Sequence, residues 1–124
     1  MSKYDRILVV EDDPDGQAVV AHILQSLKMP IDVASDAEEA GQYLFDSGTV
    51  YQAIIIDLAL PGKDGWELLS QILNDPNTAG IPCIAITAFH TSKMREEALR
   101  AGFTAYFSKP LDATSFARQL TAIL

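Results

Sequence analysis

The stretch AIIIDLALPGKDGWELL, residues 53–69, decides the fold class of this 124-residue chain. Its run of isoleucines, Ile54 to Ile56, is typical of a strand that is covered on both faces of a parallel sheet. The run ends on Asp57, a carboxylate that apolar surroundings penalise. A loop with Pro61 and Gly62 follows, and then a helical pattern resumes. This strand therefore carries a charged side chain to its carboxyl end.

The same alternation of strand and helix repeats five times along the chain. Segments with apolar residues at helical spacing, such as Val20, Ile23 and Leu27, separate short apolar runs. The apolar runs are residues 7–10, 31–33, 53–56, 83–86 and 105–107. Regular alternation of this kind predicts an α/β fold with five parallel strands and five helices.

The composition of the runs predicts their order in the sheet. Runs 7–10, 53–56 and 83–86 are continuously apolar, as central strands must be. Run 31–33 contains Asp32 and run 105–107 is short, so both suit edges. This pattern matches the doubly wound (flavodoxin-like) order 2-1-3-4-5, in which the ligand crevice lies outside the carboxyl ends of the first and third strands.

Local signals predict where several helices begin and end. Ser35 with Glu38 has the spacing of a capping box at the start of the second helix. Asp112 suits the N-cap of the last helix, and Gly102 suits the end of the fourth.

Composition excludes several classes of protein. Seventeen acidic against nine basic residues give a net charge of -8, which repels a phosphate backbone, so we expect no direct nucleic-acid binding. No apolar run approaches the roughly 20 residues of a membrane span, so we expect no membrane insertion. The single cysteine, Cys83, lies in an apolar run, which predicts an inert thiol and a cytoplasmic location. The length suits one domain, residues 1–124.

Polar side chains follow four of the five predicted strands. Glu11 and Asp12 follow the first, Asp57 the third and Lys109 the fifth, while Thr87 ends the fourth. Carboxylates held close together raise one another's pKa or require a cation, and hard oxygen ligands of this type suit Mg²⁺. The Lys109 ammonium and the Thr87 hydroxyl are groups that a phosphoryl oxygen needs. The sequence therefore predicts a magnesium-dependent phosphoryl site at this edge of the sheet.

Four motifs carry a resemblance to a known family. ILVVEDDP, IIIDLALPGKDGWELL, IPCIAITA and AGFTAYFSKPL resemble the receiver domain of two-component response regulators. The resemblance extends from Arg6 to Leu124. The chain is similar to single-domain regulators of the chemotaxis type. The alternative is a receiver domain cut from a longer protein.

The resemblance implies a role for each residue at the acidic end of the sheet. Asp57 would be the phosphorylated aspartate and would also bind Mg²⁺. Asp12 would bind the metal directly and Glu11 through a water molecule. The backbone carbonyl of Ala59 would complete the coordination that the protein supplies. Lys109 would contact the phosphoryl group.

The resemblance also implies a conformational switch. The Lys109–Pro110 peptide would be cis. Thr87 would be the switch hydroxyl, swinging toward the phosphoryl oxygens, and Tyr106 would be the switch aromatic, turning inward into the space released. A sensor histidine kinase or a histidine phosphotransfer protein would supply the phosphoryl group. The domain would catalyse only its own phosphorylation and dephosphorylation, and its downstream partner is not readable from the sequence.

Three alternative functions compete with this interpretation. A haloacid-dehalogenase-type phosphatase needs a second aspartate two residues after its nucleophile, where this chain has Ala59. A flavodoxin-like nucleotide or flavin binder needs a Gly- or Ser/Thr-rich loop after the first strand, where this chain has EDDPDG. A degenerate receiver that binds partners without phosphorylation normally lacks a member of the pocket, whereas Glu11, Asp12, Asp57, Thr87 and Lys109 are all present.

Overall fold

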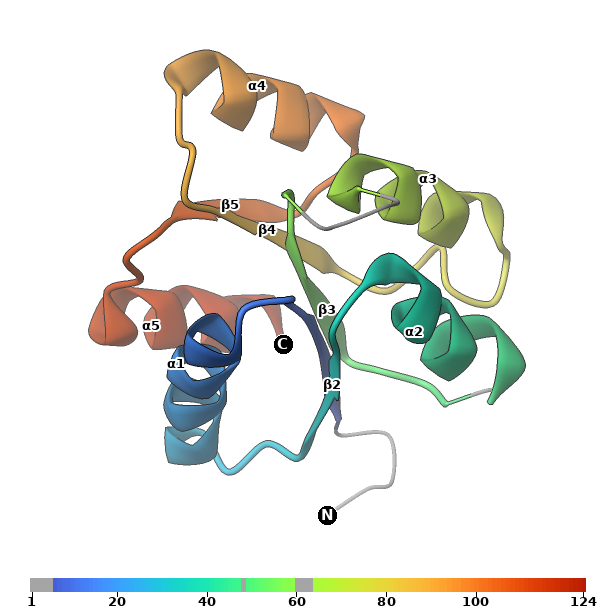
Figure 1. Cartoon of the computed structure of the whole chain (residues 1–124), viewed down its shortest axis with the longest axis horizontal. Helices are drawn as coiled ribbons and strands as arrows, with labels where there is room; N and C mark the ends of the chain where they lie inside the picture. Colours follow the sequence, from blue (N-terminus) through green and yellow to red (C-terminus); the bar gives the residue numbers. More distant parts are fainter. Residues whose placement is uncertain (1–5, 48, 60–63) are drawn as a thin grey trace.

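A five-stranded parallel sheet forms the centre of the molecule (Figure 1). The computed structural model describes residues 6–47, 49–59 and 64–124. The strands are β1 (Ile7–Val10), β2 (Ile31–Ala34), β3 (Ala53–Asp57), β4 (Cys83–Thr87) and β5 (Ala105–Ser108). Their order is β2-β1-β3-β4-β5, so the predicted fold class and strand order are confirmed.

Helices cover both faces of the sheet. They are α1 (Pro14–Ser26), α2 (Ala37–Gly41), α3 (Gly65–Asn74), α4 (Ser92–Ala101) and α5 (Ala113–Ile123). Helix α2 continues into a π-helical segment, η1 (Gln42–Asp46), which the apolar spacing did not predict. Helices α1 and α5 lie together on one side of the sheet, and α2, α3 and α4 lie on the other (Figure 1).

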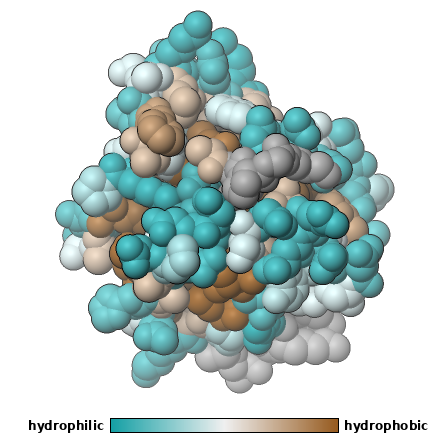
Figure 2. Space-filling view, in the orientation of Figure 1, coloured by the Kyte–Doolittle hydropathy of each residue, from teal (hydrophilic) through white to brown (hydrophobic). Residues whose placement is uncertain are grey.

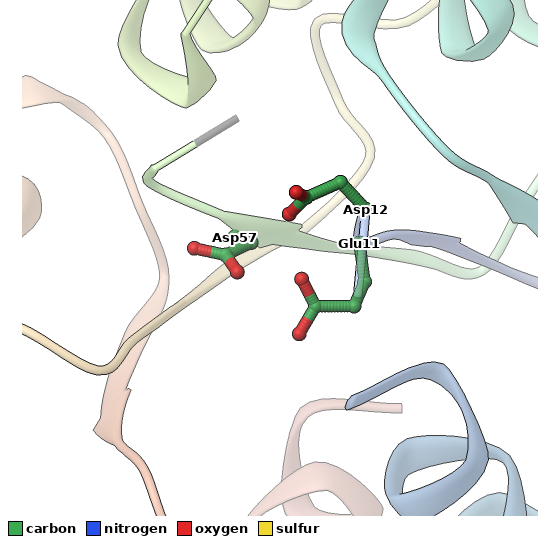
Figure 3. Close-up of side chains that lie close together, drawn as sticks. All are labelled: Glu11, Asp12 and Asp57. Carbon is green, nitrogen blue, oxygen red and sulfur yellow. The ribbon is translucent and has the colours of Figure 1, made fainter. Parts of the chain in front are cut away.

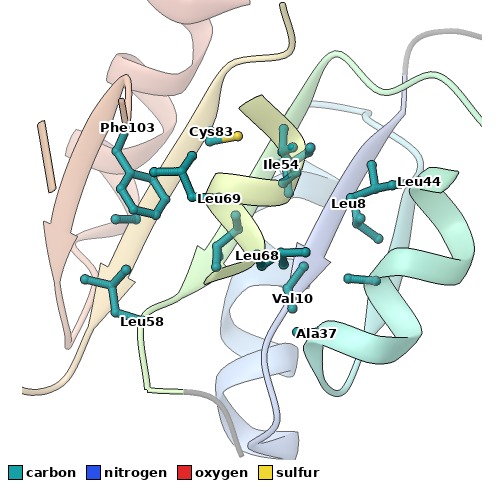
Figure 4. Close-up of a cluster of buried hydrophobic side chains, with 14 of the residues drawn as sticks. Leu8, Val10, Ala37, Leu44, Ile54, Leu58, Leu68, Leu69, Cys83 and Phe103 are labelled. Carbon is teal, nitrogen blue, oxygen red and sulfur yellow. The ribbon is translucent and has the colours of Figure 1, made fainter. Parts of the chain in front are cut away.

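Alternate residues of the central strands enter two separate cores. In β1, Leu8 and Val10 point into the core under α2, α3 and α4, while Ile7 and Val9 point into the core under α1 and α5. Figure 4 shows the first of these cores, in which side chains of the strands and helices interdigitate. Because both faces are covered, the central strands must be apolar at every position, and each fully buried aliphatic side chain contributes about 1.5–3 kcal/mol.

The polar residue of edge strand β2 is fully paired. The Asp32 carboxylate accepts hydrogen bonds from the Arg6 guanidinium at 2.6 and 3.2 Å. It also accepts one from the buried Tyr51 hydroxyl at 2.8 Å. The hydrogen bond from Arg6 holds the pKa of Asp32 below its ordinary value despite partial burial. This edge strand therefore tolerates the charged Asp32, because the Arg6 guanidinium pairs with its carboxylate.

Two of the three predicted helix ends are confirmed. Asp112 caps α5 by accepting from the Ser115 N–H at 2.8 Å, and Gly102 ends α4 with a φ of 123°. The predicted cap at Ser35 is wrong by one residue. Asp36 is the N-cap of α2 and accepts from the Glu39 N–H at 2.8 Å, while the Glu39 side chain accepts from the Ser35 N–H at 3.1 Å, so both groups of the box lie one residue later than predicted.

The outer surface is mainly polar on the face drawn in Figure 2, where hydrophobic areas are small and lie between hydrophilic ones. Within the described part of the chain, every helix is too short or too polar to cross a lipid bilayer.

Candidate functional site

The strand register brings the predicted acidic residues to one place. Val10 of β1 lies opposite Ile56 of β3, so the residues that follow them, Glu11 and Asp57, are neighbours. Carboxylate oxygens of Glu11, Asp12 and Asp57 all lie within 4.8 Å of one another. Figure 3 shows the three carboxylates facing one another at the carboxyl ends of β1 and β3. The convergence predicted from the strand ends is therefore present.

The Asp57 carboxylate is buried and held by two donors. Only 5% of the residue is exposed. Its Oδ1 accepts from the Ala59 N–H at 2.9 Å, and its Oδ2 accepts from Lys109 Nζ at 2.9 Å. Asp12, by contrast, is exposed. The Asp57 carboxylate is thus held in one orientation, and the exposed Asp12 lies next to it.

Lys109 is shared between two buried carboxylates. Besides Asp57, its Nζ donates to Oε1 of Glu11, a residue with 0% exposure. The other Glu11 oxygen, Oε2, is buried and has no hydrogen-bond partner among the described residues. Three carboxylates around one ammonium leave an excess of negative charge, and an unpaired buried carboxylate oxygen is costly. The donor set fits a divalent cation that prefers oxygen ligands.

The two buried carboxyl groups have pKa values that shift in opposite directions. Burial, together with the neighbouring Asp57, raises the pKa of Glu11 to about 7. Burial alone would also raise the pKa of Asp57, but the neighbouring Glu11 side chain, the Ala59 N–H and Lys109 hold it below its ordinary value. Burial disfavours the Lys109 ammonium, yet its bonds to the two carboxylates raise its pKa. Asp57 is therefore anionic at neutral pH.

The Thr87 side chain is buried beside this cluster. It is 1% exposed, and its hydroxyl oxygen accepts from the Phe89 N–H at 3.1 Å. Thr87 ends β4, and its register partner on β5 is Ser108, two residues after Tyr106. The Thr87 hydroxyl oxygen is therefore bonded to the loop that follows β4, and a hydroxyl that accepts one bond can still donate its own O–H.

Tyr106 already lies inside the protein. The residue is only 6% exposed, and its hydroxyl lies 3.0 Å from Nδ1 of His90. An inward turn from an exposed position is therefore not available to the ring in this conformation. His90 carries no signal in the sequence, because a single histidine in a loop has no periodic partner, and only the fold places it against Tyr106 of β5.

The remaining site predictions have mixed outcomes. The Lys109–Pro110 peptide is cis, as the resemblance implied. Ala59 lies beside Asp57, but here it contributes its N–H, so the role of its carbonyl stays a prediction. Pro61 and Gly62 lie outside the described residues. Cys83 is a buried free thiol, as expected.

Comparison with known sequences agrees with this geometry. The family model of the response regulator receiver domain matches residues 7–121. An uncharacterized 14.6 kDa protein of Leptolyngbya boryana is 35% identical over 112 residues, which are 90% of this chain and 84% of that protein. Response regulator RppA of Synechocystis is 33% identical over 118 residues, which are 95% of this chain. The chain spans only 50% of RppA.

Solved structures show the same fold. A putative response regulator from Chloroflexus aurantiacus superposes with a TM-score of 0.88 at 26% identity, covering 98% of both chains. The receiver domain of sensor histidine kinase PA1611 from Pseudomonas aeruginosa, solved with a magnesium ion in its active site cleft, gives a TM-score of 0.84 at 32% identity and covers 95% of both chains. With the family model matching nearly the whole chain, and with the acidic cluster and Lys109 in place, this chain belongs to the response regulator receiver domains, the signalling modules of two-component systems.

Proposed function

We propose that Asp57 accepts a phosphoryl group from a phosphohistidine of a sensor histidine kinase or a histidine phosphotransfer protein. The observation that carries this proposal is the Asp57 carboxylate itself, which is buried, anionic and bonded to Lys109 beside the exposed Asp12. The similarity to the receiver of a sensor histidine kinase supports the class of partner.

The chemistry needs few groups beyond those at the site. An oxygen of Asp57 forms the new P–O bond while the P–N bond of the donor breaks, and the electron pair of that bond returns to the donor imidazole. Lys109 Nζ, now shared by Glu11 and Asp57, is placed to bind a phosphoryl oxygen. Orientation of the nucleophile by β3 and charge stabilisation by Lys109 account for the protein's contribution.

The resident metal in this proposal is Mg²⁺. Asp12, Asp57 and the backbone carbonyl of Ala59 would hold it, with Glu11 nearby. When bound, the ion neutralises the carboxylates and the incoming phosphoryl oxygens. The excess of negative charge and the unpaired Glu11 oxygen support this assignment.

Exposure to a small phosphodonor tests the proposal. With acetyl phosphate and Mg²⁺, intact-mass measurement of the wild type should show one added phosphoryl group, and peptide mapping should place it on Asp57. The Asp57→Asn variant, and the wild type in chelator, should show essentially none. A phosphoryl group on another residue, or equal labelling of Asp57→Asn, would contradict the assignment. A pocket that takes no label would favour the phosphorylation-independent receiver.

Thr87 and Tyr106 form the switch of the proposed receiver. The Thr87 side chain would swing to donate its O–H to a phosphoryl oxygen, and this movement would alter the bond from the Phe89 N–H and so shift the loop that carries His90. Since Tyr106 bonds to His90, its ring would then lose or change that contact. A charge-assisted hydrogen bond contributes about 1.5–3 kcal/mol, enough to shift a two-state population about tenfold to a hundredfold.

Replacement of Thr87 by alanine should separate modification from signalling. We expect Thr87→Ala to accept phosphate on Asp57 but to confine beryllofluoride-induced NMR shifts to the surroundings of Asp57. The wild type should show such shifts across residues 88–124, including the His90 and Tyr106 rings. Equal long-range shifts in both proteins would exclude Thr87 as the coupling group.

A further inference from the structure

Glycine at position 16 lowers the stability of α1, so its presence there needs a structural reason. It is the third residue of α1, and glycine destabilises the interior of a helix relative to alanine. A Cβ atom at this position would overlap Oε1 of Glu11 and would lie 2.8 Å from its Cδ and 3.1 Å from its Cγ. The bare backbone of Gly16 is therefore the surface against which the Glu11 carboxyl group packs.

The backbone of Glu11 is fixed, so its side-chain torsions alone decide where the carboxylate lies. The Glu11 N–H donates to the Ala34 carbonyl at 3.0 Å. The Glu11 carbonyl accepts from Gln17 Nε2 at 2.6 Å. With both main-chain groups held, the side chain enters the space over Gly16 and there reaches Lys109.

On the other side of the Glu11 carboxylate lie the other two acids. Their oxygens are within 4.8 Å of it, and Figure 3 shows Glu11 between the start of α1 and the carboxylates of Asp12 and Asp57. A group inserted at Gly16 would push the Glu11 carboxylate off Lys109 and toward Asp12 and Asp57. The carboxylate is the end of a flexible side chain, so this movement needs no change in the backbone.

We propose that Gly16 is a positioning residue that sets the magnesium affinity of the site. By leaving space for Glu11 to pair with Lys109, it keeps one of the three carboxylates withdrawn from the cation. This inference rests on the proposed function, since it assumes that Mg²⁺ binds at Asp12 and Asp57. It predicts that filling the space strengthens Mg²⁺ binding, because the charge that attracts the cation moves closer to it.

Two substitutions test the inference, one at Gly16 and one at Glu11. Gly16→Ala should displace the Glu11 carboxylate, and Glu11→Asp should shorten it so that it no longer reaches Lys109. In calorimetric Mg²⁺ titrations at pH 8 and fixed ionic strength, each should lower the dissociation constant about threefold to tenfold, a tenfold change being about 1.4 kcal/mol. In the double variant the two effects should not add fully, because both changes act by moving the same carboxylate away from Lys109.

Gly41→Ala is the matched control. Gly41 is also helical, with φ of -61°, and a Cβ there would meet only the Phe45 ring at an ordinary 3.6 Å. Its Mg²⁺ affinity should equal that of the wild type, which separates the effect of helix propensity from that of Glu11.

Each outcome bears on one of the two proposals. An unchanged or weaker affinity in Gly16→Ala, or full additivity with Glu11→Asp, overturns the role of Gly16. If Gly16→Ala does not fold by circular dichroism, Glu11→Asp alone decides, and failure to tighten binding overturns the inference. A wild type that binds no Mg²⁺ overturns the metal assignment in the proposed function instead.

Discussion

Replacing Glu11 by glutamine should stabilise the metal-free protein at pH 8 by about 2–3 kcal/mol, which raises its melting temperature by several degrees. The reason is the buried Glu11 carboxyl group, whose pKa rises from an ordinary 4.5 to about 7 in the folded protein. At pH 8 the folded wild type must keep this group ionised in a site where burial disfavours the charge. Glutamine has nearly the same shape and no charge to ionise.

The pH dependence of this gain has a definite sign. A carboxyl group whose folded pKa lies above its unfolded value destabilises the fold when ionised, so the cost appears as the pH rises from 4.5 and is complete above about 7. The difference between Glu11→Gln and the wild type should therefore be large at pH 8 and small at pH 4.5. Thermal unfolding in chelator at a series of pH values measures it.

Glu96→Gln is the control for this experiment, since Glu96 is an exposed glutamate on α4. It should change the melting temperature little at either pH. A Glu11→Gln variant that is less stable than the wild type at pH 8 would show that the Lys109 attraction outweighs the burial of Glu11.

Replacing Lys109 by methionine should have the opposite effect, a loss of about 2–3 kcal/mol at pH 8 in chelator. Methionine keeps most of the apolar stem, but it removes the ammonium that donates to both Glu11 and Asp57. Removing one partner of a fully buried ion pair costs about 3–5 kcal/mol, and the 24% exposure of the Lys109 side chain places the expected loss below that range. The loss should diminish toward pH 5, where a protonated Glu11 can donate to Asp57.

Urea unfolding measures this loss, and two further variants define its cause. Lys93→Met removes a lysine from the surface of α4, where its side chain is 85% exposed, and should have little effect. Combining Lys109→Met with Glu11→Gln should recover at least half of the stability, because the repulsion between two buried anions is then gone. A Lys109→Met protein as stable as the wild type at pH 8 would mean that the shared ammonium does not offset the buried charges.

Much of this molecule was predictable from short-range patterns. The run Ile54 to Ile56 predicts a strand covered on both faces, and five such alternations predict the sheet and its order. Because the carboxyl ends of parallel strands meet at one edge, the residue after each run predicts the site, and the structure brings Glu11, Asp12 and Asp57 together. These inferences work because strand periodicity and burial depend on residues close in the sequence.

Other features depend on side-chain torsions and on distant contacts. The sequence predicted Ser35 as the cap of α2, but in the folded chain the Asp36 side chain is the one that reaches a free N–H group. The burial of Tyr106 and its bond to His90 join a strand to a loop that has no regular pattern.

The acidic site shows the same division. Its residue types and their place at the strand ends were determined by the sequence alone, since hydrophobic period and strand direction are local properties. The tertiary structure decided how the charges pair. Glu11 and Lys109 are 98 residues apart, and their contact exists only because α1 presents a residue without a side chain, Gly16, beside the end of β1. A packing relation of this kind depends on the distance between two elements in space, which no pattern within either element contains.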